Sequence, residues 1–377
     1  MLDLKRQYGP LHRELLDAVG HVLETQQFIL GEQVAVFEHA AAAELGVGYA
    51  RGCSSGTDAL WLALAAAGVG PGTAVVTSPF SFFASVSAIL RTGATALLAD
   101  IDPVTFNLDP IAVEALLRET KSGAVRAILP VHLYGQCADW TAFSGLASER
   151  QLTLVEDAAQ AWGAEWKGRK AGGLGDLAAF SFYPTKNLSA AGDAGMVTTN
   201  AEALAERVTM LRQHGMRRRY FHDEMGWNMR MDGFQGAILS VKLKYIAGWT
   251  EARRSLANRY HELFAAAGLA EAGLYPIRGV VLPREVPGAH HVWHQYVIRT
   301  NRRDELRAFL AARRIGSEIY YPVPLHRQDA LQELGHGEGS FPEAERAARE
   351  VLALPLFPEL REDEQRTVVD AIAEFLS

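Results

Sequence analysis

Short apolar runs alternate with helix-like segments over the first two thirds of the chain. The runs cover residues 74–77, 94–99, 126–131, 152–155, 178–182 and 196–199. Continuous apolar runs of this length are typical of parallel strands that are buried on both faces. Asp109 and Asp139 precede two of the intervening segments, as helix N-caps do. We therefore predict an α/β fold with a mostly parallel central sheet that is flanked by helices.

The pattern changes after residue 247. A helix-forming stretch at 251–267 is followed by connections rich in proline and glycine, an aromatic-rich strand candidate at 292–299 and further helices. We predict a large cofactor-binding domain over residues 1–247 and a small C-terminal α+β domain over residues 248–377. The cleft between the two is the expected place for a small-molecule site.

One uncharged stretch, residues 59–90, is long enough to suggest a membrane span. Pro71-Gly72 and Ser78-Pro79 interrupt it, so we interpret it as helix, turn, strand and loop inside the α/β core. The chain also starts without the basic residues and apolar run of a secretory signal. We predict no membrane partner and no export.

Composition narrows the class of protein further. Lys and Arg number 37 against 44 Asp and Glu, which gives a formal charge of −7. This net negative charge provides no general electrostatic attraction for nucleic acid or an anionic membrane. The two cysteines, Cys53 and Cys137, are too few for a disulfide framework and suit a reducing compartment. We predict a cytoplasmic protein.

Three chemical features follow the predicted strands. Lys186 lies in a Pro-containing turn directly after an apolar run, where burial lowers the pKa of an amine and makes it a nucleophile toward an aldehyde. A surface lysine is the alternative. Asp157 lies at the carboxyl end of another run, where open α/β sheets bind ligands; it could pair with a protonated ring nitrogen or could simply cap a helix.

The third feature is the start of the helix that follows Cys53. Gly56 permits close approach of the backbone, Thr57 adds a hydroxyl, and free amides at a helix start favour a phosphate. Asp58 is expected to point away. An amine for an aldehyde, a carboxylate for a ring nitrogen and a helix start for a phosphate are the three contacts that pyridoxal 5′-phosphate requires.

The chain resembles the DegT/DnrJ/EryC1/StrS family of sugar aminotransferases, which are fold-type-I pyridoxal-phosphate enzymes. The resemblance covers nearly the whole chain. Its most specific segments are Gly56-Thr-Asp-Ala-Leu60, Glu156-Asp-Ala-Ala-Gln160, Ser181-Phe-Tyr-Pro-Thr-Lys-Asn-Leu188, Gly226-Trp-Asn-Met-Arg230 and Tyr321-Pro-Val-Pro-Leu-His326.

The resemblance implies the roles of individual residues. Lys186 would hold the cofactor covalently and act as the base, and Asp157 would pair with the ring nitrogen. Gln160 would contact the ring hydroxyl, while Phe82 and Ala159 would cover the two ring faces. The phosphate would be held by Gly56, Thr57 and Ser181, joined by Asn228 from the neighbouring subunit of a homodimer.

The resemblance also implies an activity. An amino group would move from an amino acid, L-glutamate in relatives, to a dTDP- or UDP-linked 3-keto or 4-keto hexose for polysaccharide or antibiotic sugars. A keto-cyclitol or an aminobenzoate precursor is the alternative acceptor, and a non-catalytic cofactor-binding regulator is a different class of function. The substrate candidates are Tyr183, Arg219, Arg230, Tyr321 and His326.

Departures from the family pattern concern the substrate more than the cofactor. Ser81 replaces a threonine, Ala194 replaces a glycine, Met229 replaces a serine, and Tyr320 replaces a common histidine. His132 is interpreted as a core histidine. The histidines at 290, 291 and 294 have no acidic or cysteine partner nearby in the sequence, so no metal site is predicted.

Overall fold

A seven-stranded sheet forms the centre of the computed structural model, which describes residues 2–121 and 123–377. The five strands at one end of the sheet are mutually parallel, and only β9 runs against both of its neighbours. The predicted α/β fold with a mostly parallel sheet is confirmed. The strand order is β1 (Tyr49–Cys53), β9 (Gly195–Thr199), β8 (Leu177–Ser181), β5 (Thr153–Asp157), β4 (Val125–Leu129), β2 (Ala74–Thr77) and β3 (Thr95–Leu98).

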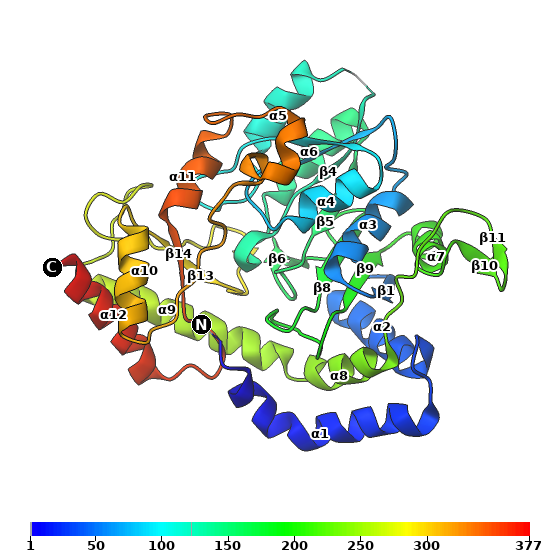
Figure 1. The fold of residues 1–377 in the computed structure, drawn as a ribbon, viewed down its shortest axis with the longest axis horizontal. Coiled ribbons are helices and arrows are strands. Elements are labelled where there is room, and N and C mark those ends of the chain that lie inside the picture. Colours follow the sequence, from blue (N-terminus) through cyan, green and yellow to red (C-terminus); the bar gives the residue numbers. More distant parts are fainter. Residues whose placement is uncertain (1, 122) are drawn as a thin grey trace.

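Helices cover both faces of this sheet (Figure 1). Alternate residues of the strands belong to two different apolar clusters, because successive side chains of a strand point to opposite faces. One cluster joins the sheet to α3 (Gly56–Ala66), α4 (Ala84–Arg91) and α7 (Glu202–Leu211). The other joins it to α2 (Gly31–Leu45), α5 (Pro110–Glu119), α6 (Trp140–Arg150) and α8 (Gly233–Leu243).

Local sequence signals set several element boundaries as predicted. The Asp109 carboxylate accepts the Ile111 N–H at 2.9 Å and begins α5, and the Asp139 carboxylate accepts the Ala142 N–H at 3.1 Å and begins α6. The uncharged stretch 59–90 forms α3, β2 and α4. Within the described ranges no helix combines the length and the apolar character that crossing a membrane requires.

Strand β1 was missed by the sequence analysis. Its residues are Tyr-Ala-Arg-Gly-Cys, so an arginine and a glycine interrupt the apolar pattern. Pairing with β9 over five residues, rather than local propensity, makes this segment a strand.

The C-terminal part is built on α9 (Ile246–Ala266), and it confirms the helix expected at 251–267. The boundary predicted at 247/248 lies in the first turn of α9 and stays a prediction. The strand expected at 292–299 begins only at Tyr296, because Trp293 adopts a left-handed conformation with φ of 47°. The other elements of this part are β13 (Tyr296–Arg299), β14 (Val351–Leu354), α10 (Arg303–Ala312), α11 (Pro342–Glu350) and α12 (Glu362–Leu376).

Several smaller elements connect distant parts of the chain. Strand β12 (Ala289–His290) returns to pair with β6 (Glu165–Trp166), which also pairs with β7 (Arg169–Lys170). The first helix, α1 (Leu4–Thr25), packs on α8, and Arg6 near its start binds Glu364 of α12 at 2.7 Å. Both halves of the chain are therefore tied together at several points.

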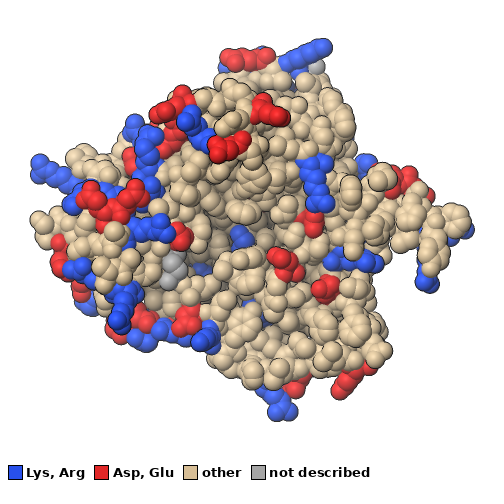
Figure 2. Space-filling model, in the orientation of Figure 1, with Lys and Arg blue, Asp and Glu red and all other residues tan. Residues whose placement is uncertain are grey.

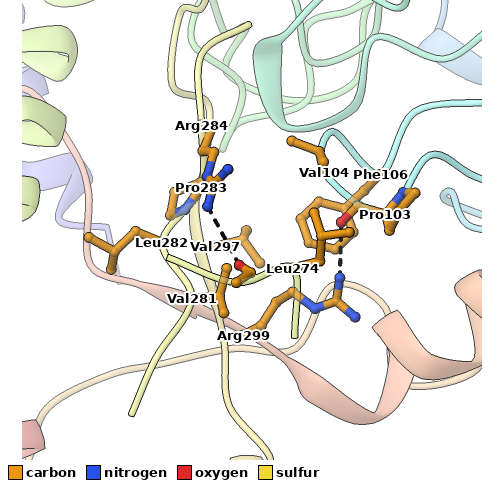
Figure 3. A pocket seen from close by; sticks show the side chains of 11 residues that line it. Pro103, Val104, Phe106, Leu274, Val281, Leu282, Pro283, Arg284, Val297 and Arg299 are labelled. Carbon is orange, nitrogen blue, oxygen red and sulfur yellow. Dashed lines mark hydrogen bonds between the residues drawn. The ribbon is translucent and has the colours of Figure 1, made fainter. Parts of the chain in front are cut away.

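A small cavity lies at one junction between the two halves (Figure 3). Arg299 of β13 donates to the carbonyl oxygen of Pro103 at 2.9 Å, and Arg284 donates to that of Ala272 at 2.6 Å. The cavity measures about 10 Å³, which is the room that a single water needs. It is a packing feature of the junction and too small for a ligand.

Candidate active site

A cavity of about 710 Å³ lies at the carboxyl ends of β5 and β8, as expected for a ligand site in an open α/β sheet. Its walls come from both halves of the chain, as the sequence analysis predicted. Figure 2 shows this face hollowed near its middle. Its lining includes Ser55, Gly56, Thr57, Ser81, Phe82, Ser85, Asp157, Ala159, Gln160, Ser181, Tyr183, Lys186, Asp193, His294, Gln295, Glu318, Tyr320 and Tyr321.

Lys186 reaches this cavity from the turn that follows β8. Its backbone N–H binds the carbonyl oxygen of Tyr183 at 2.8 Å, which closes the turn. Burial lowers the pKa of the Lys186 ammonium to about 8, although the negative charge of Asp157 acts in the opposite direction. A substantial neutral fraction is therefore present near physiological pH, as nucleophilic and base chemistry require.

Asp157 ends β5 and points into the same cavity. Its carboxylate accepts hydrogen bonds from the Ser85 hydroxyl at 2.7 Å and the Ala159 N–H at 3.3 Å. Burial raises the pKa of this carboxyl, and the hydrogen bonds and the charge of Lys186 partly offset that shift. No helix begins at Asp157, so the alternative interpretation as an N-cap is wrong.

The neighbouring carboxylate, Glu156, points to the other face of β5. It accepts backbone N–H groups of Gly172, Leu174 and Gly175 at 2.7–2.9 Å and lies 3.1 Å from Nε2 of His132. Nδ1 of His132 accepts the Ala138 N–H, so the ring proton is on Nε2. The interpretation of His132 as a core histidine is confirmed.

The start of α3 forms a cradle beside these two groups. Ser55 caps the helix by accepting the Asp58 N–H at 3.1 Å, which leaves the first amides of the helix free to bind an anion. A Cβ on Gly56 would lie 2.5 Å from Cβ of Ser181, so only glycine permits this approach. Asp58 points away, as expected, and binds Arg91 at 2.7 Å.

Other predicted cofactor contacts line the same cavity. The Gln160 side-chain oxygen accepts the Tyr134 N–H at 2.7 Å, which orients the amide. Its Nε2 donates to the Tyr321 hydroxyl at 3.1 Å. Phe82 presents a largely exposed ring to the cavity, 6.3 Å from the ring of Tyr321. Ala159 and the substrate candidate Tyr183 also belong to the wall.

Three predicted residues lie outside the cavity of their own chain. Arg230 donates a hydrogen bond through Nε to Oδ1 of Asn228 at 2.9 Å, and Asn228 is exposed. Arg219 lies on the hairpin of β10 (Met216–Arg218) and β11 (Phe221–His222), which projects from the body of the molecule (Figure 1). Figure 2 shows basic side chains at the end of this projecting hairpin.

The fourth predicted residue outside the cavity is His326. It is buried, and its Nε2 lies 3.0 Å from Oε1 of Glu345, which also accepts the Gly339 N–H. The sequence placed His326 with Tyr321 because the two share a motif. The short helix η2 (Leu325–Arg327) turns the histidine into the core, so the structure does not support its role as a substrate contact.

His294 is a cavity residue that the sequence analysis considered only as a metal ligand. Asn187 donates through Nδ2 to the Val292 carbonyl, which leaves its Oδ1 to accept from Nδ1 of His294 at 3.0 Å. Burial and the nearby charge of Lys186 lower the pKa of His294 well below its usual value. It is thus a neutral group beside Lys186. The residue before it, Trp293, has a left-handed conformation, and nothing in the sequence signals this turn.

The cavity is poor in positive charge. Lys186 is the only cation among the described residues that line it, whereas Asp157, Asp193 and Glu318 are acidic. No arginine is among the described residues of this wall that could bind a phosphate or a substrate carboxylate.

The residues present fit pyridoxal 5′-phosphate. The glycine-lined helix start suits a phosphate, the buried carboxylate of Asp157 suits a protonated ring nitrogen, and the Lys186 amine suits the aldehyde. A lysine, an aspartate and a phosphate cradle around one cavity define the class of pyridoxal-phosphate-dependent enzymes.

The chain belongs to the DegT/DnrJ/EryC1/StrS aminotransferase family, whose model matches residues 11–373. The predictions of a pyridoxal-phosphate cofactor and of aminotransferase activity are confirmed. One similar protein is a "Pleiotropic regulatory protein" of Geobacillus stearothermophilus, 48% identical over 375 residues, which cover 100% of this chain and 98% of that protein.

Another relative carries an enzymatic name. The dTDP-3-amino-3,4,6-trideoxy-alpha-D-glucose transaminase of Streptomyces venezuelae is 41% identical over 374 residues, 99% of this chain and 95% of the relative. The crystal structure of S. venezuelae DesV in complex with a ketimine intermediate has a TM-score of 0.93 and 41% identity, covering 100% of this chain and 97% of that one.

Proposed function

We propose that this enzyme transfers an amino group from L-glutamate to the carbonyl carbon of a nucleotide-linked ketosugar in the cytoplasm. The observation that carries the transfer chemistry is the convergence of Lys186, Asp157 and the α3 start on one cavity. The name of the Streptomyces venezuelae relative supports a sugar nucleotide as acceptor. The volume of about 710 Å³ is in the range of small-molecule sites.

We assign the cofactor contacts as follows. Gly56, Thr57 and Ser181 hold the phosphate, Gln160 meets the ring hydroxyl, and Phe82 and Ala159 cover the ring. When bound, the cofactor supplies an electron sink. Asp157 keeps the ring nitrogen protonated, which its position at the end of β5 supports.

Lys186 is the proton-transfer group of the reaction. Its amine takes the proton from the α-carbon of the donor in the first half and returns a proton to the aminated carbon of the acceptor in the second. A pKa of about 8 supports this role, because the amine is then an effective base and its conjugate acid an effective donor near neutral pH.

The functional unit is a homodimer with shared sites. The shortage of cations in the cavity, the exposure of Asn228 and Arg219, and the place of Arg230 outside the cavity support this proposal. The partner subunit then supplies Asn228 to the cofactor phosphate, and Arg219 and Arg230 to the substrate diphosphate, which arginine binds with paired hydrogen bonds. Tyr183 and Tyr321 contact the sugar.

Mixed dimers test this sharing. Lys186→Ala and Asn228→Ala should each inactivate the enzyme, but a mixed dimer of the two keeps one site with both residues intact. Co-expression with two different affinity tags isolates that dimer. We expect about half of the wild-type activity, since one of two sites is complete. Inactive mixed dimers would show that Lys186 and Asn228 act within one chain.

The two halves of the reaction test the function itself. L-Glutamate should shift the visible absorbance of the reconstituted enzyme and release one equivalent of 2-oxoglutarate per site. The resulting form should return to its starting spectrum on addition of dTDP- or UDP-linked ketosugars. A response only to scyllo-inosose would favour the keto-cyclitol alternative.

A regulatory function is the second candidate, because one close relative bears a regulatory name. A regulator without turnover needs no base of adjusted pKa. An enzyme that binds the cofactor but shows no spectral response to any amino acid would support the regulator and reject the transferase.

A further inference from the structure

Two serines form a chain of hydrogen bonds behind Asp157. The Ser85 hydroxyl lies 2.7 Å from Oδ2 of Asp157, and the Ser81 hydroxyl lies 2.9 Å from that of Ser85. All three side chains are more than nine-tenths buried, and all three belong to the cavity wall. The chain therefore joins α4, which carries Ser85, to the end of β5.

The direction of this chain depends on the charge of Asp157. With the carboxylate ionised, Ser81 donates to Ser85 and Ser85 donates to Asp157, so every hydrogen has an acceptor. With Oδ2 protonated and donating to Ser85, both bonds reverse, and the Ser81 hydrogen loses its acceptor. Over the ranges 2–121 and 123–377, Ser81 Oγ has no bonding partner other than Ser85. The arrangement thus favours the ionised carboxylate.

The other contacts of Asp157 stabilise its negative charge less than the Ser85 hydrogen bond does. The Ala159 N–H reaches Oδ1 at the longer distance of 3.3 Å, and Lys186 acts through its charge without a hydrogen bond. Ser85 also lies in the first turn of α4, whose dipole favours a negative charge there. Burial opposes ionisation of the carboxyl, and the Ser85 bond is the largest influence that counters burial.

We propose that Ser85 is a positioning residue that keeps the Asp157 carboxylate ionised and aimed at the ring nitrogen, with Ser81 as the second donor of the chain. This inference rests on the proposed role of Asp157. It goes beyond that role because it identifies what allows a buried carboxylate to hold a charge.

The ring nitrogen itself provides the test. Reconstitution with pyridoxal phosphate labelled with 15N in the ring gives an NMR shift that reports protonation of this nitrogen, independently of turnover. The wild type should show a protonated ring at neutral pH. In Ser85→Ala the carboxylate is a stronger base, so the shift should move toward the unprotonated ring and Ser85→Thr should restore it.

The rate of the L-glutamate half-reaction should follow the same order. Loss of one hydrogen bond to a charged group corresponds to about a tenfold effect or more, so we expect roughly a tenfold slower reaction in Ser85→Ala. Ser81→Ala should shift the resonance in the same direction but less, because it removes only the second donor.

Asp157→Asn separates the two proposals. If it deprotonates the ring and Ser85→Ala does not, the role of Ser85 is overturned and that of Asp157 stands. If Asp157→Asn also leaves the ring protonated, the assignment of Asp157 fails, and with it that of Ser85. Should Ser85→Ala not fold, Ser85→Cys retains the volume with a weaker donor, and a wild-type resonance in that variant would overturn the proposal.

Discussion

Glu156 and Asp157 are adjacent on β5, yet they face opposite sides of the sheet and differ in how completely their carboxylates are hydrogen-bonded. Glu156 is fully buried and accepts from three backbone amides and one imidazole, so its charge is compensated within the fold. The Asp157 carboxylate accepts from only two donors, the Ser85 hydroxyl at 2.7 Å and the Ala159 N–H at 3.3 Å, and its pKa is raised. A buried carboxylate with complete partners stabilises a fold, whereas one with incomplete partners is available to a ligand.

The largest loss of activity is expected from replacing Lys186, which shares the cavity with Asp157. Lys186→Ala should lower kcat for transamination at least about a thousandfold, since it removes both the covalent attachment and the base. Reconstituted protein should hold the cofactor only without a covalent bond. Lys167→Ala, at an exposed turn, is the matched control. Residual activity near wild type would reject Lys186 as the base.

Asp157→Asn should lower kcat by roughly a hundredfold or more, because the ring nitrogen loses its counter-ion. The same change should leave the melting temperature of the cofactor-free protein within about 2 °C of wild type, since it removes a charge whose burial is costly. Calorimetry and steady-state rates measure the two effects. A large loss of stability would place Asp157 in the same class as Glu156.

Glu156→Gln should show the reverse pattern. The amide replaces one carboxylate oxygen by a donor that faces backbone N–H groups, so we expect a loss of about 2–4 kcal/mol in the free energy of unfolding. Denaturant unfolding measures it. The kcat of the folded fraction should fall far less than in Asp157→Asn. If kcat collapsed while stability was retained, the distinction between the two faces would be wrong.

The interaction between Asp157 and Lys186 predicts a pH dependence. Only the neutral amine captures the aldehyde, so covalent capture of pyridoxal phosphate by the cofactor-free enzyme should accelerate as the pH rises, with a midpoint near pH 8. In Asp157→Asn the midpoint should move to lower pH, since the carboxylate charge stabilises the ammonium. Stopped-flow absorbance resolves both curves. An unchanged midpoint would mean that the two charges are uncoupled.

The smallest effect on activity is expected at His326, whose partners are inside the fold. His326→Gln should change KM for the acceptor by less than about threefold, with a modest loss of stability from the broken contact to Glu345. Tyr321→Phe is the comparison on the cavity wall. A tenfold rise in KM for His326→Gln alone would restore the sequence-based prediction of a substrate contact.

Much of this site was predictable because its chemistry is local. Asp157 ends one predicted strand and Lys186 lies in the turn after another, and the ends of parallel strands meet at one edge of the sheet. Gly56 was predicted from the small residues at the start of its helix, although the strand before it was missed. The helix caps at Asp109 and Asp139 follow from short-range patterns in the same way. The order of the strands in the sheet depends instead on pairing between distant segments.

Other features depended on contacts between distant segments. Ser85 and Asp157 are 72 positions apart, and only the packing of α4 on β5 brings them to 2.7 Å. The sequence predicted His326 as a substrate contact because it shares a motif with Tyr321, but the short helix η2 turns it into the core, while His294, for which only metal binding was considered, lines the cavity.

The sequence by itself determined which chemical groups this protein possesses, the order in which strands present them, and that Glu156 and Asp157 face opposite sides, because side chains alternate along a strand. The tertiary structure alone decided which of the two is satisfied. Hydrogen-bond partners such as Gly172, Ser85 and His132 come from elsewhere in the chain, and their geometry exists only after those segments pack.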